Sequence, residues 1–299
     1  MEVNIFQVDA FSSKPFGGNP TIIVPNAKWI SNEDRQKIAN EMNVSYTSFV
    51  QQLGDERFKV SFFTPIREVR FSGHGTIATF YAMAEMGYIK PIYNGIKKAV
   101  METNIGKLPV EISYKNDRVD KVIMELDGPF DFGEVVDGPV LLHSLGLDRS
   151  EIGVGDQYYP PEIIATGLPY IILPLKDRET LDRLELDACC SLLEYCKAHD
   201  VAGVHAFYIP ELNSDKVYSR NFAPLIDINE EPVSGIAAGA LIYYLKKHKL
   251  IESNEINSIQ GFAMNRPSEA HCYLEEEDGK FKVKVGGSAN IVLEGVLKY

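Results

Sequence analysis

Cysteine is scarce in this sequence, and the cysteines that occur have no metal or redox spacing. The chain of 299 residues contains Cys189, Cys190, Cys196 and Cys272, and none of them forms a CxxC motif. Disulfide frameworks and zinc sites need more regularly spaced cysteines. We therefore expect reduced thiols in a cytoplasmic protein, no metal site, and core or helix-face positions for the first three cysteines.

The sequence also lacks long apolar runs and an excess of basic residues. No stretch of about 18 apolar residues occurs, and no basic segment precedes an apolar one at the N-terminus, so we expect neither a membrane span nor a signal peptide. The net charge of −12 argues against nucleic acid and anionic membranes as partners, because both need a basic surface. An anionic small molecule stays compatible, since a helix N-terminus binds anions even on an acidic protein.

The most informative segment that is present runs from Arg70 to Thr79. Gly73-His74-Gly75-Thr76 follows a strand-like run, and no charge appears between Thr76 and Glu85. A helix that is apolar on every side is buried, and its N-terminal amides can face an anion. Glycine also tolerates positive φ and lets a ligand approach closely. The pattern predicts a ligand-binding turn in which His74 is the ionisable group.

A second segment has the same design. Glu230-Glu231-Pro232-Val233-Ser234-Gly235 leads into a helix of small and apolar residues, which is expected over residues 234–247. Two such elements indicate duplicated domains whose buried helix N-termini face one site. The turn Asp127-Gly128-Pro129 marks the boundary. We predict an N-terminal domain of residues 1–127, completed by a C-terminal strand at 288–299, and a C-terminal domain of residues 128–287.

Each half contains many strand-like runs and one central apolar helix. This order differs from the regular β-α-β-α alternation of a doubly wound sheet. The predicted fold class is α/β (α+β) with two similar domains. In each, a highly curved and mostly antiparallel sheet is expected to wrap around a central buried helix.

Motifs along nearly the whole chain resemble those of the phenazine-biosynthesis isomerase (PhzF-like) family. In chain order they include Pro15-Phe16-Gly17-Gly18-Asn19-Pro20, Gly73-His74-Gly75-Thr76, Arg220-Asn221-Phe222-Ala223-Pro224, Gln260-Gly261 and Gly286-Gly287-Ser288-Ala289. The resemblance implies the diaminopimelate-epimerase fold, with the active site in the cleft between two similar domains. It also implies a cofactor-free isomerase and a homodimer.

The catalytic residues that this resemblance implies are only partly present. The family histidine is His74, but Tyr46 stands where the family has its general-base glutamate, after Asn43-Val44-Ser45. The family's Glu-Asp pair reads Glu230-Glu231, and a substrate-binding serine is replaced by Ile236.

Three side chains are candidates for acid/base chemistry. His74 has a reference pKa of about 6.5, near working pH. Glu231 suits the task if apolar neighbours raise its pKa. Tyr46, with a reference pKa of about 10, is better suited to donate a hydrogen bond to a substrate oxygen. The structural alternatives are a turn histidine, an acid at a helix N-terminus and an ordinary strand aromatic.

The expected substrate contacts lie at the two helix starts and in the first glycine-rich turn. They are Ser72, Gly73, Gly75, Thr76, Ser234, Gly235, Ile236 and Asn19. Asn19 has a turn-fixing alternative, and Arg220 can either bind a carboxylate or form a surface salt bridge. Related two-thiol epimerases carry cysteine at the positions of Ser72 and Ser234. A hydroxyl cannot replace a low-pKa thiolate, so two-base epimerisation is disfavoured.

Two hypotheses follow. The first is an isomerase acting on a small carboxylated metabolite held by two helix N-termini. The second is a non-catalytic small-molecule-binding protein on the same scaffold, motivated by Tyr46. The other histidines, including His205, share no spacing and are interpreted as structural or surface residues.

Overall fold

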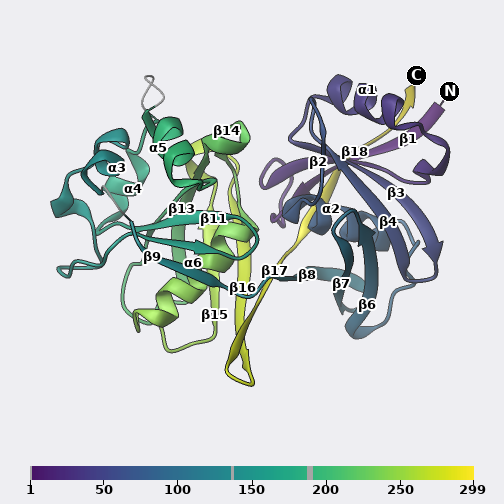
Figure 1. Ribbon diagram of the computed structural model, residues 1–299. Helices are drawn as coiled ribbons and strands as arrows, with labels where there is room; N and C mark the ends of the chain where they lie inside the picture. The colour runs from purple at the N-terminus through teal and green to yellow at the C-terminus, as the bar shows by residue number, and fades with distance from the viewer. Residues whose placement is uncertain (1, 136–137, 187–190) are drawn as a thin grey trace. The chain divides into compact units, whose positions relative to one another are not determined.

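The computed structural model describes residues 2–135, 138–186 and 191–299, and it is a mixed α/β structure made mostly of strands. The chain divides into two compact units (Figure 1). Unit 1 comprises Met1–Glu125 and Gly286–Tyr299, and unit 2 comprises Leu126–Val285. Cys189 and Cys190, for which the sequence predicts core or helix-face positions, lie outside the described residues.

Unit 1 joins both ends of the chain. Its elements are β1 (Glu2–Ala10), β2 (Asn19–Val24), η1 (Ala27–Trp29), α1 (Asn32–Met42), β3 (Tyr46–Gly54), β4 (Arg57–Phe63), β5 (Glu68–Val69), α2 (Gly73–Glu85), β6 (Asn94–Thr103), β7 (Gly106–Lys115), β8 (Arg118–Leu126) and β18 (Ala289–Lys298). Strand β18 pairs with β1 along its length, so the N- and C-terminal strands lie side by side (Figure 1).

Unit 2 is formed by the middle of the chain. Its elements are β9 (Phe130–Glu134), α3 (Gly138–Ser144), η2 (Arg149–Glu151), β10 (Glu162–Ala165), β11 (Pro169–Pro174), α4 (Arg178–Asp182), α5 (Ser191–His199), β12 (Gly203–Tyr208), β13 (Lys216–Ala223), η3 (Pro224–Ile226), β14 (Ile228–Glu231), α6 (Gly235–Lys247), β15 (Glu255–Gln260), η4 (Phe262–Met264), β16 (Ser268–Glu277) and β17 (Lys280–Gly287).

Both units repeat one order of strand pairing. In unit 1, the pairs β18–β1, β1–β2, β3–β4 and β6–β7 are antiparallel, while β2–β3 and β4–β6 are parallel. In unit 2, β9–β10, β10–β11, β12–β13 and β15–β16 are antiparallel, while β11–β12 and β13–β15 are parallel. Parallel neighbours need a crossover connection. The second crossover carries β5 and α2 in unit 1, and β14 and α6 in unit 2.

The two crossover helices are buried because they carry almost no charge. Eleven residues of α2 are buried, and the helix contacts β1, β2, β3, β7 and β18 (Figure 1). In α6, nine residues are buried, and the two lysines of the helix lie in its last turn. The wrapping of a curved sheet around each helix stays a prediction.

Local signals set the ends of the surface helix α1. Ser31 accepts a hydrogen bond from the amide of Asp34 at its start, and Asn43 takes the left-handed conformation at its end, with φ of 48°. Asparagine tolerates this conformation better than most residues.

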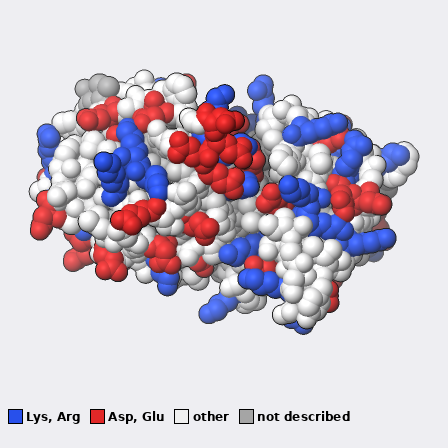
Figure 2. All heavy atoms as spheres, turned by 90° about the horizontal axis from the view of Figure 1, so that it is seen from below, with Lys and Arg blue, Asp and Glu red and all other residues white. Residues whose placement is uncertain are grey.

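The cysteines and the charges agree with a thiol-containing acidic protein. Cys196 and Cys272 are buried free thiols, and burial raises the pKa of Cys196 to about 12. Over the described ranges, no three metal-ligating side chains cluster and no helix could cross a bilayer. On the face drawn in Figure 2, acidic and basic side chains are interspersed.

A Gly75→Ala substitution tests the packing at the start of α2. A Cβ at Gly75 would lie 2.9 Å from a ring carbon of Phe62 and 2.9 Å from the Ser72 hydroxyl oxygen. Overpacking costs about 1–3 kcal/mol, and the better helix propensity of alanine offsets about 1 kcal/mol. We expect urea denaturation to show that the free energy of unfolding of Gly75→Ala is lower than that of the parent by up to about 2 kcal/mol.

Gly54→Ala is the matched control, because a Cβ there meets nothing within 4 Å. Its free energy of unfolding should stay within about 0.5 kcal/mol of the parent. Equal stability of the two variants would contradict the packing argument.

Candidate functional site

The start of α2 is a capped helix turn with two amides left over. The Ser72 hydroxyl accepts from the amide of Gly75 at 3.1 Å, and the Ser72 carbonyl accepts from the amide of Thr76 at 3.0 Å. The first four amides of a helix have no partner inside it. The Ser72 hydroxyl satisfies one of them, and the amides of Gly73 and His74 form no hydrogen bond within this turn.

The glycines of this turn act differently from the sequence-based expectation. Neither Gly73 nor Gly75 has a positive φ, because both already belong to the helix. Gly75 is needed for space, since the ring of Phe62 and the Ser72 hydroxyl lie where its Cβ would be. Thr76 is also structural: its hydroxyl donates to the Ser72 carbonyl at 2.8 Å, so both of its donors are used within the turn.

His74 is the second residue of α2, and only 6% of its surface is exposed. The side-chain amide of Asn19, itself fully buried, lies 3.3 Å from His74 Nδ1. An amide nitrogen can only donate, so Nδ1 accepts and the proton of the neutral ring sits on Nε2. Nε2 is buried and has no hydrogen-bond partner among the described residues. The ring therefore offers one N–H donor.

Burial changes the chemistry expected of His74. Loss of hydration lowers its pKa from 6.5 to about 3, so the imidazole is neutral at physiological pH. The expectation of a base with a pKa near neutrality is wrong for this environment. A neutral imidazole can still polarise a substrate oxygen through Nε2–H.

Tyr46 begins β3 and lies directly beside the histidine. Its ring centre is 4.8 Å from that of His74, in an edge-to-face arrangement. Parallel pairing of β2 with β3 places Tyr46 opposite Thr21, two residues beyond Asn19. Asn19, Tyr46 and His74 thus form one cluster within unit 1.

The start of α6 repeats the cap of α2. The Ser234 hydroxyl accepts from the amide of Ala237 at 3.4 Å, and the Ser234 carbonyl accepts from the amide of Ala238 at 3.1 Å. This leaves the amides of Gly235 and Ile236, the equivalents of Gly73 and His74. The roles of Ser72, Ser234 and these amides in substrate binding stay predictions, as does their convergence on one cleft.

Gln260 fixes the turn before α6. Its side-chain oxygen accepts from the amide of Ser234 at 3.0 Å, and its nitrogen donates to Ser258 Oγ at 2.9 Å. The next residue, Gly261, has φ of 78°, and a Cβ there would lie 2.8 Å from the carbonyl oxygen of Pro232. Only glycine allows this close approach. The sequence marked Gln260-Gly261 as a motif but gave it no role.

Glu231 belongs to a strand, whereas the sequence suggested a turn. It ends β14 and lies opposite Asn221 of β13. The side-chain nitrogen of Asn221 donates to Glu231 Oε1 at 3.1 Å, and Asn221 Oδ1 lies 3.0 Å from Nδ1 of the buried His205. Sequence reasoning assigned His205 to the structural residues and missed this contact, because the two side chains are brought together only by strand register.

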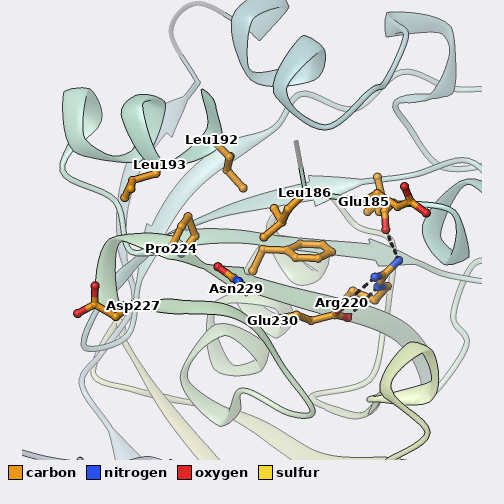
Figure 3. A pocket seen from close by; sticks show the side chains of 11 residues that line it. Glu185, Leu186, Leu192, Leu193, Arg220, Pro224, Asp227, Asn229 and Glu230 are labelled. Atoms are coloured by element: carbon orange, nitrogen blue, oxygen red, sulfur yellow. Dashed lines mark hydrogen bonds and ion pairs between the residues drawn. The ribbon is translucent and has the colours of Figure 1, made fainter. Parts of the chain in front are cut away.

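Arg220 is engaged within unit 2 and does not present its guanidinium to a carboxylated substrate. Its Nε and Nη2 atoms donate to the two carboxylate oxygens of Glu230 at 2.8 and 2.9 Å. Its Nη1 atom donates to the carbonyl of Leu184 at 2.7 Å, and also to those of Leu181 and Asp182. Figure 3 shows this pair at the wall of a cavity of about 810 Å³.

Comparison with known proteins decides the family. The model of the phenazine biosynthesis-like protein family, PhzC-PhzF, matches residues 8–295. The chain belongs to this family.

Several PhzF-family relatives are named isomerases. An uncharacterized isomerase of Clostridium acetobutylicum is 34% identical, over 98% of this chain and 97% of that protein. The trans-2,3-dihydro-3-hydroxyanthranilate isomerase of Pseudomonas aeruginosa is 28% identical, over 96% of each chain. The crystal structure of a PhzF-family protein of Bacillus anthracis matches with a TM-score of 0.84, at 26% identity over the full length of both chains.

This membership confirms the resemblance drawn from the motifs. The PhzF motif Gly73-His74-Gly75-Thr76 is the capped start of α2, and Arg220-Asn221 lies on β13 facing Glu230 and Glu231. The motifs therefore mark the capped helix start and the strand that holds the carboxylates.

Acidification should destabilise this PhzF-family protein through its buried histidines. The pKa values of His74 and His205 are lowered by burial to about 3 and about 4. Below about pH 6.5 the unfolded chain binds protons that the native state does not, so stability present above that pH is lost as pH falls. Each histidine should contribute a slope of about 1.4 kcal/mol per pH unit.

Urea denaturation between about pH 7 and pH 5 measures this slope. His74→Asn should remove the part of this slope that His74 contributes, because asparagine does not titrate. An unchanged slope in this variant would contradict the burial-lowered pKa of His74.

Proposed function

We propose that the protein is a cofactor-independent isomerase that moves a proton within a small carboxylated metabolite, with Glu231 as the acid/base group. The observation that carries this assignment is the hydrogen bond from Asn221 to Glu231, which holds a half-buried carboxylate at the end of β14. Proton transfer needs a positioned group, and a carboxylate held at a strand end meets that need. Membership of a family with named isomerases supports the reaction class.

His74 has a different role in this proposal. Its low pKa makes it a poor base, and its Nε2–H is a donor without a partner among the described residues. Such a donor stabilises negative charge that develops on a substrate oxygen during proton transfer. Tyr46, whose ring lies against His74, is the second candidate polar side chain of this cluster.

The substrate class follows from the helix starts. The amides of Gly73 and His74, and those of Gly235 and Ile236, are the groups that bind anions at helix N-termini. A carboxylate suits them, and the Pseudomonas relative is named for a substrate that carries one.

Tyr46 is also the observation that favours the rival function, a non-catalytic small-molecule-binding protein. A tyrosine is a weak base at neutral pH, and it stands where the resemblance places the family glutamate. Incorporation of solvent deuterium into a bound carboxylated compound separates the two functions, because only the isomerase catalyses it.

Turnover of trans-2,3-dihydro-3-hydroxyanthranilate is expected to be slow. Loss of a positioned general base typically costs about 10²–10⁴-fold in rate. NMR or absorbance assays beside the Pseudomonas isomerase should show a deficit of that size. Equal rates would show that the glutamate replaced by Tyr46 is dispensable here.

Glu231→Gln should abolish the residual exchange of substrate protons with solvent while leaving binding largely intact. Glutamine keeps the shape and still accepts from Asn221, but it cannot carry the proton. The measurement is deuterium incorporation into trans-2,3-dihydro-3-hydroxyanthranilate over hours, read by mass spectrometry.

Glu230→Gln is the matched control on the same strand. It weakens the ion pair with Arg220 and lowers stability, but exchange per folded molecule should persist. If Glu231→Gln keeps full activity, the assignment of Glu231 as the acid/base group is wrong.

A further inference from the structure

We propose that His205 and Asn221 are positioning residues that restrict the orientation of the Glu231 carboxylate for proton transfer. This inference rests on the proposed function, because it deepens the role given there to Glu231. It concerns only strands of unit 2.

The register of three adjacent strands brings these side chains into one row. On the antiparallel pair β12–β13, His205 lies opposite Asn221, and on β13–β14, Asn221 lies opposite Glu231. Directly opposed residues have their Cβ atoms about 5 Å apart, which suits contact between short polar side chains. The order in the row is imidazole, amide and carboxylate.

The hydrogen bonds of the row have only one consistent direction. The carboxylate of Glu231 accepts, so the Asn221 nitrogen faces it and the Asn221 oxygen faces His205. That oxygen can only accept, so His205 must donate from Nδ1. The imidazole thereby fixes the amide orientation, and the amide presents a donor to Glu231 Oε1.

This row is costly to bury, and packing alone does not explain it. Both His205 and Asn221 are 0% exposed. His205 Nε2 has no hydrogen-bond partner among the described residues, and the neighbour of His205 on β11 is the apolar Ile172. A buried polar atom without a partner costs free energy that an apolar side chain would avoid. The histidine contributes one thing that leucine cannot, which is the Nδ1–H that orients Asn221.

The row affects how freely the Glu231 carboxylate can change its orientation. Glu231 ends its strand and lies just before Pro232, where the chain leaves the sheet. A carboxylate there gains several rotamers unless a partner restrains it. Misplacement of a reacting group by about 1 Å can cost about 10²-fold in rate.

A pair of His205 variants separates positioning from packing. His205→Asn places an amide N–H near the position of Nδ1, whereas His205→Leu keeps the volume and removes the donor. We expect His205→Leu to lower kcat for trans-2,3-dihydro-3-hydroxyanthranilate about 10- to 100-fold, with KM little changed. His205→Asn should recover most of that loss. A merely structural role would make activity per folded molecule equal in the two variants, and that result would overturn the proposal.

Asn221→Asp changes the central residue of the row. It provides a second test of the positioning role if His205→Leu does not fold. The aspartate keeps the acceptor for His205 but presents an oxygen to Glu231 in place of the donor. The same loss of kcat is expected, and full activity would overturn the proposal.

Crystal structures of the variants give a readout that does not depend on chemistry. The distance of 3.1 Å between Asn221 Nδ2 and Glu231 Oε1 should persist in His205→Asn and be lost in His205→Leu. An unchanged contact in His205→Leu overturns the positioning role whatever the activities are. If Glu231→Gln keeps full activity but the contact breaks as expected, the proposed function fails while the positioning of the carboxylate by His205 stands.

Discussion

The burial of two helices that carry charge only at their C-terminal ends is the constraint on which the candidate site depends. Most residues of α2 and α6 are buried, and the first amides of each helix have no partner within the helix. The hydroxyls of Ser72 and Ser234 each accept from one of these amides, and the carbonyl of each serine accepts the first regular hydrogen bond of its helix. The amides of the first two residues of each helix are further donors at the positive end of the helix dipole, and donors in this position favour an anion.

The two units repeat one topology but carry different polar side chains at equivalent positions. His74 is the second residue after the cap Ser72, and the same position after Ser234 is Ile236. Glu231 ends β14 three residues before its cap, and the same position before Ser72 is Val69, which ends β5. Unit 1 therefore carries a neutral imidazole just after its cap and unit 2 carries a carboxylate just before its cap, although both units have the same order of strand pairing.

Burial also explains why the two histidines act as hydrogen-bonding groups. Both rings lose hydration, so their pKa values fall well below 6.5 and each carries one proton at neutral pH. The neighbouring asparagine decides which nitrogen carries it. Asn19 donates to Nδ1 of His74 and leaves its proton on Nε2, whereas Asn221 accepts from Nδ1 of His205. Histidine thus keeps a donor without a partner among the described residues in unit 1, and in unit 2 it donates to an asparagine.

The sequence by itself determined the family, through short motifs spread along residues 8–295. It also located the two buried helices, because the residues that start each of them lie within a few positions of one another. Charge-free runs predicted the burial of α2 and α6 in the same way. Only the tertiary structure decided that His74 is neutral and that Glu231 belongs to a strand. It also decided that Arg220 forms an ion pair with Glu230 and that His205 donates a hydrogen bond to Asn221. A pKa depends on how much water folding removes, and cross-strand contacts depend on the register of β12, β13 and β14. Neither quantity is written in the spacing of residues along the chain.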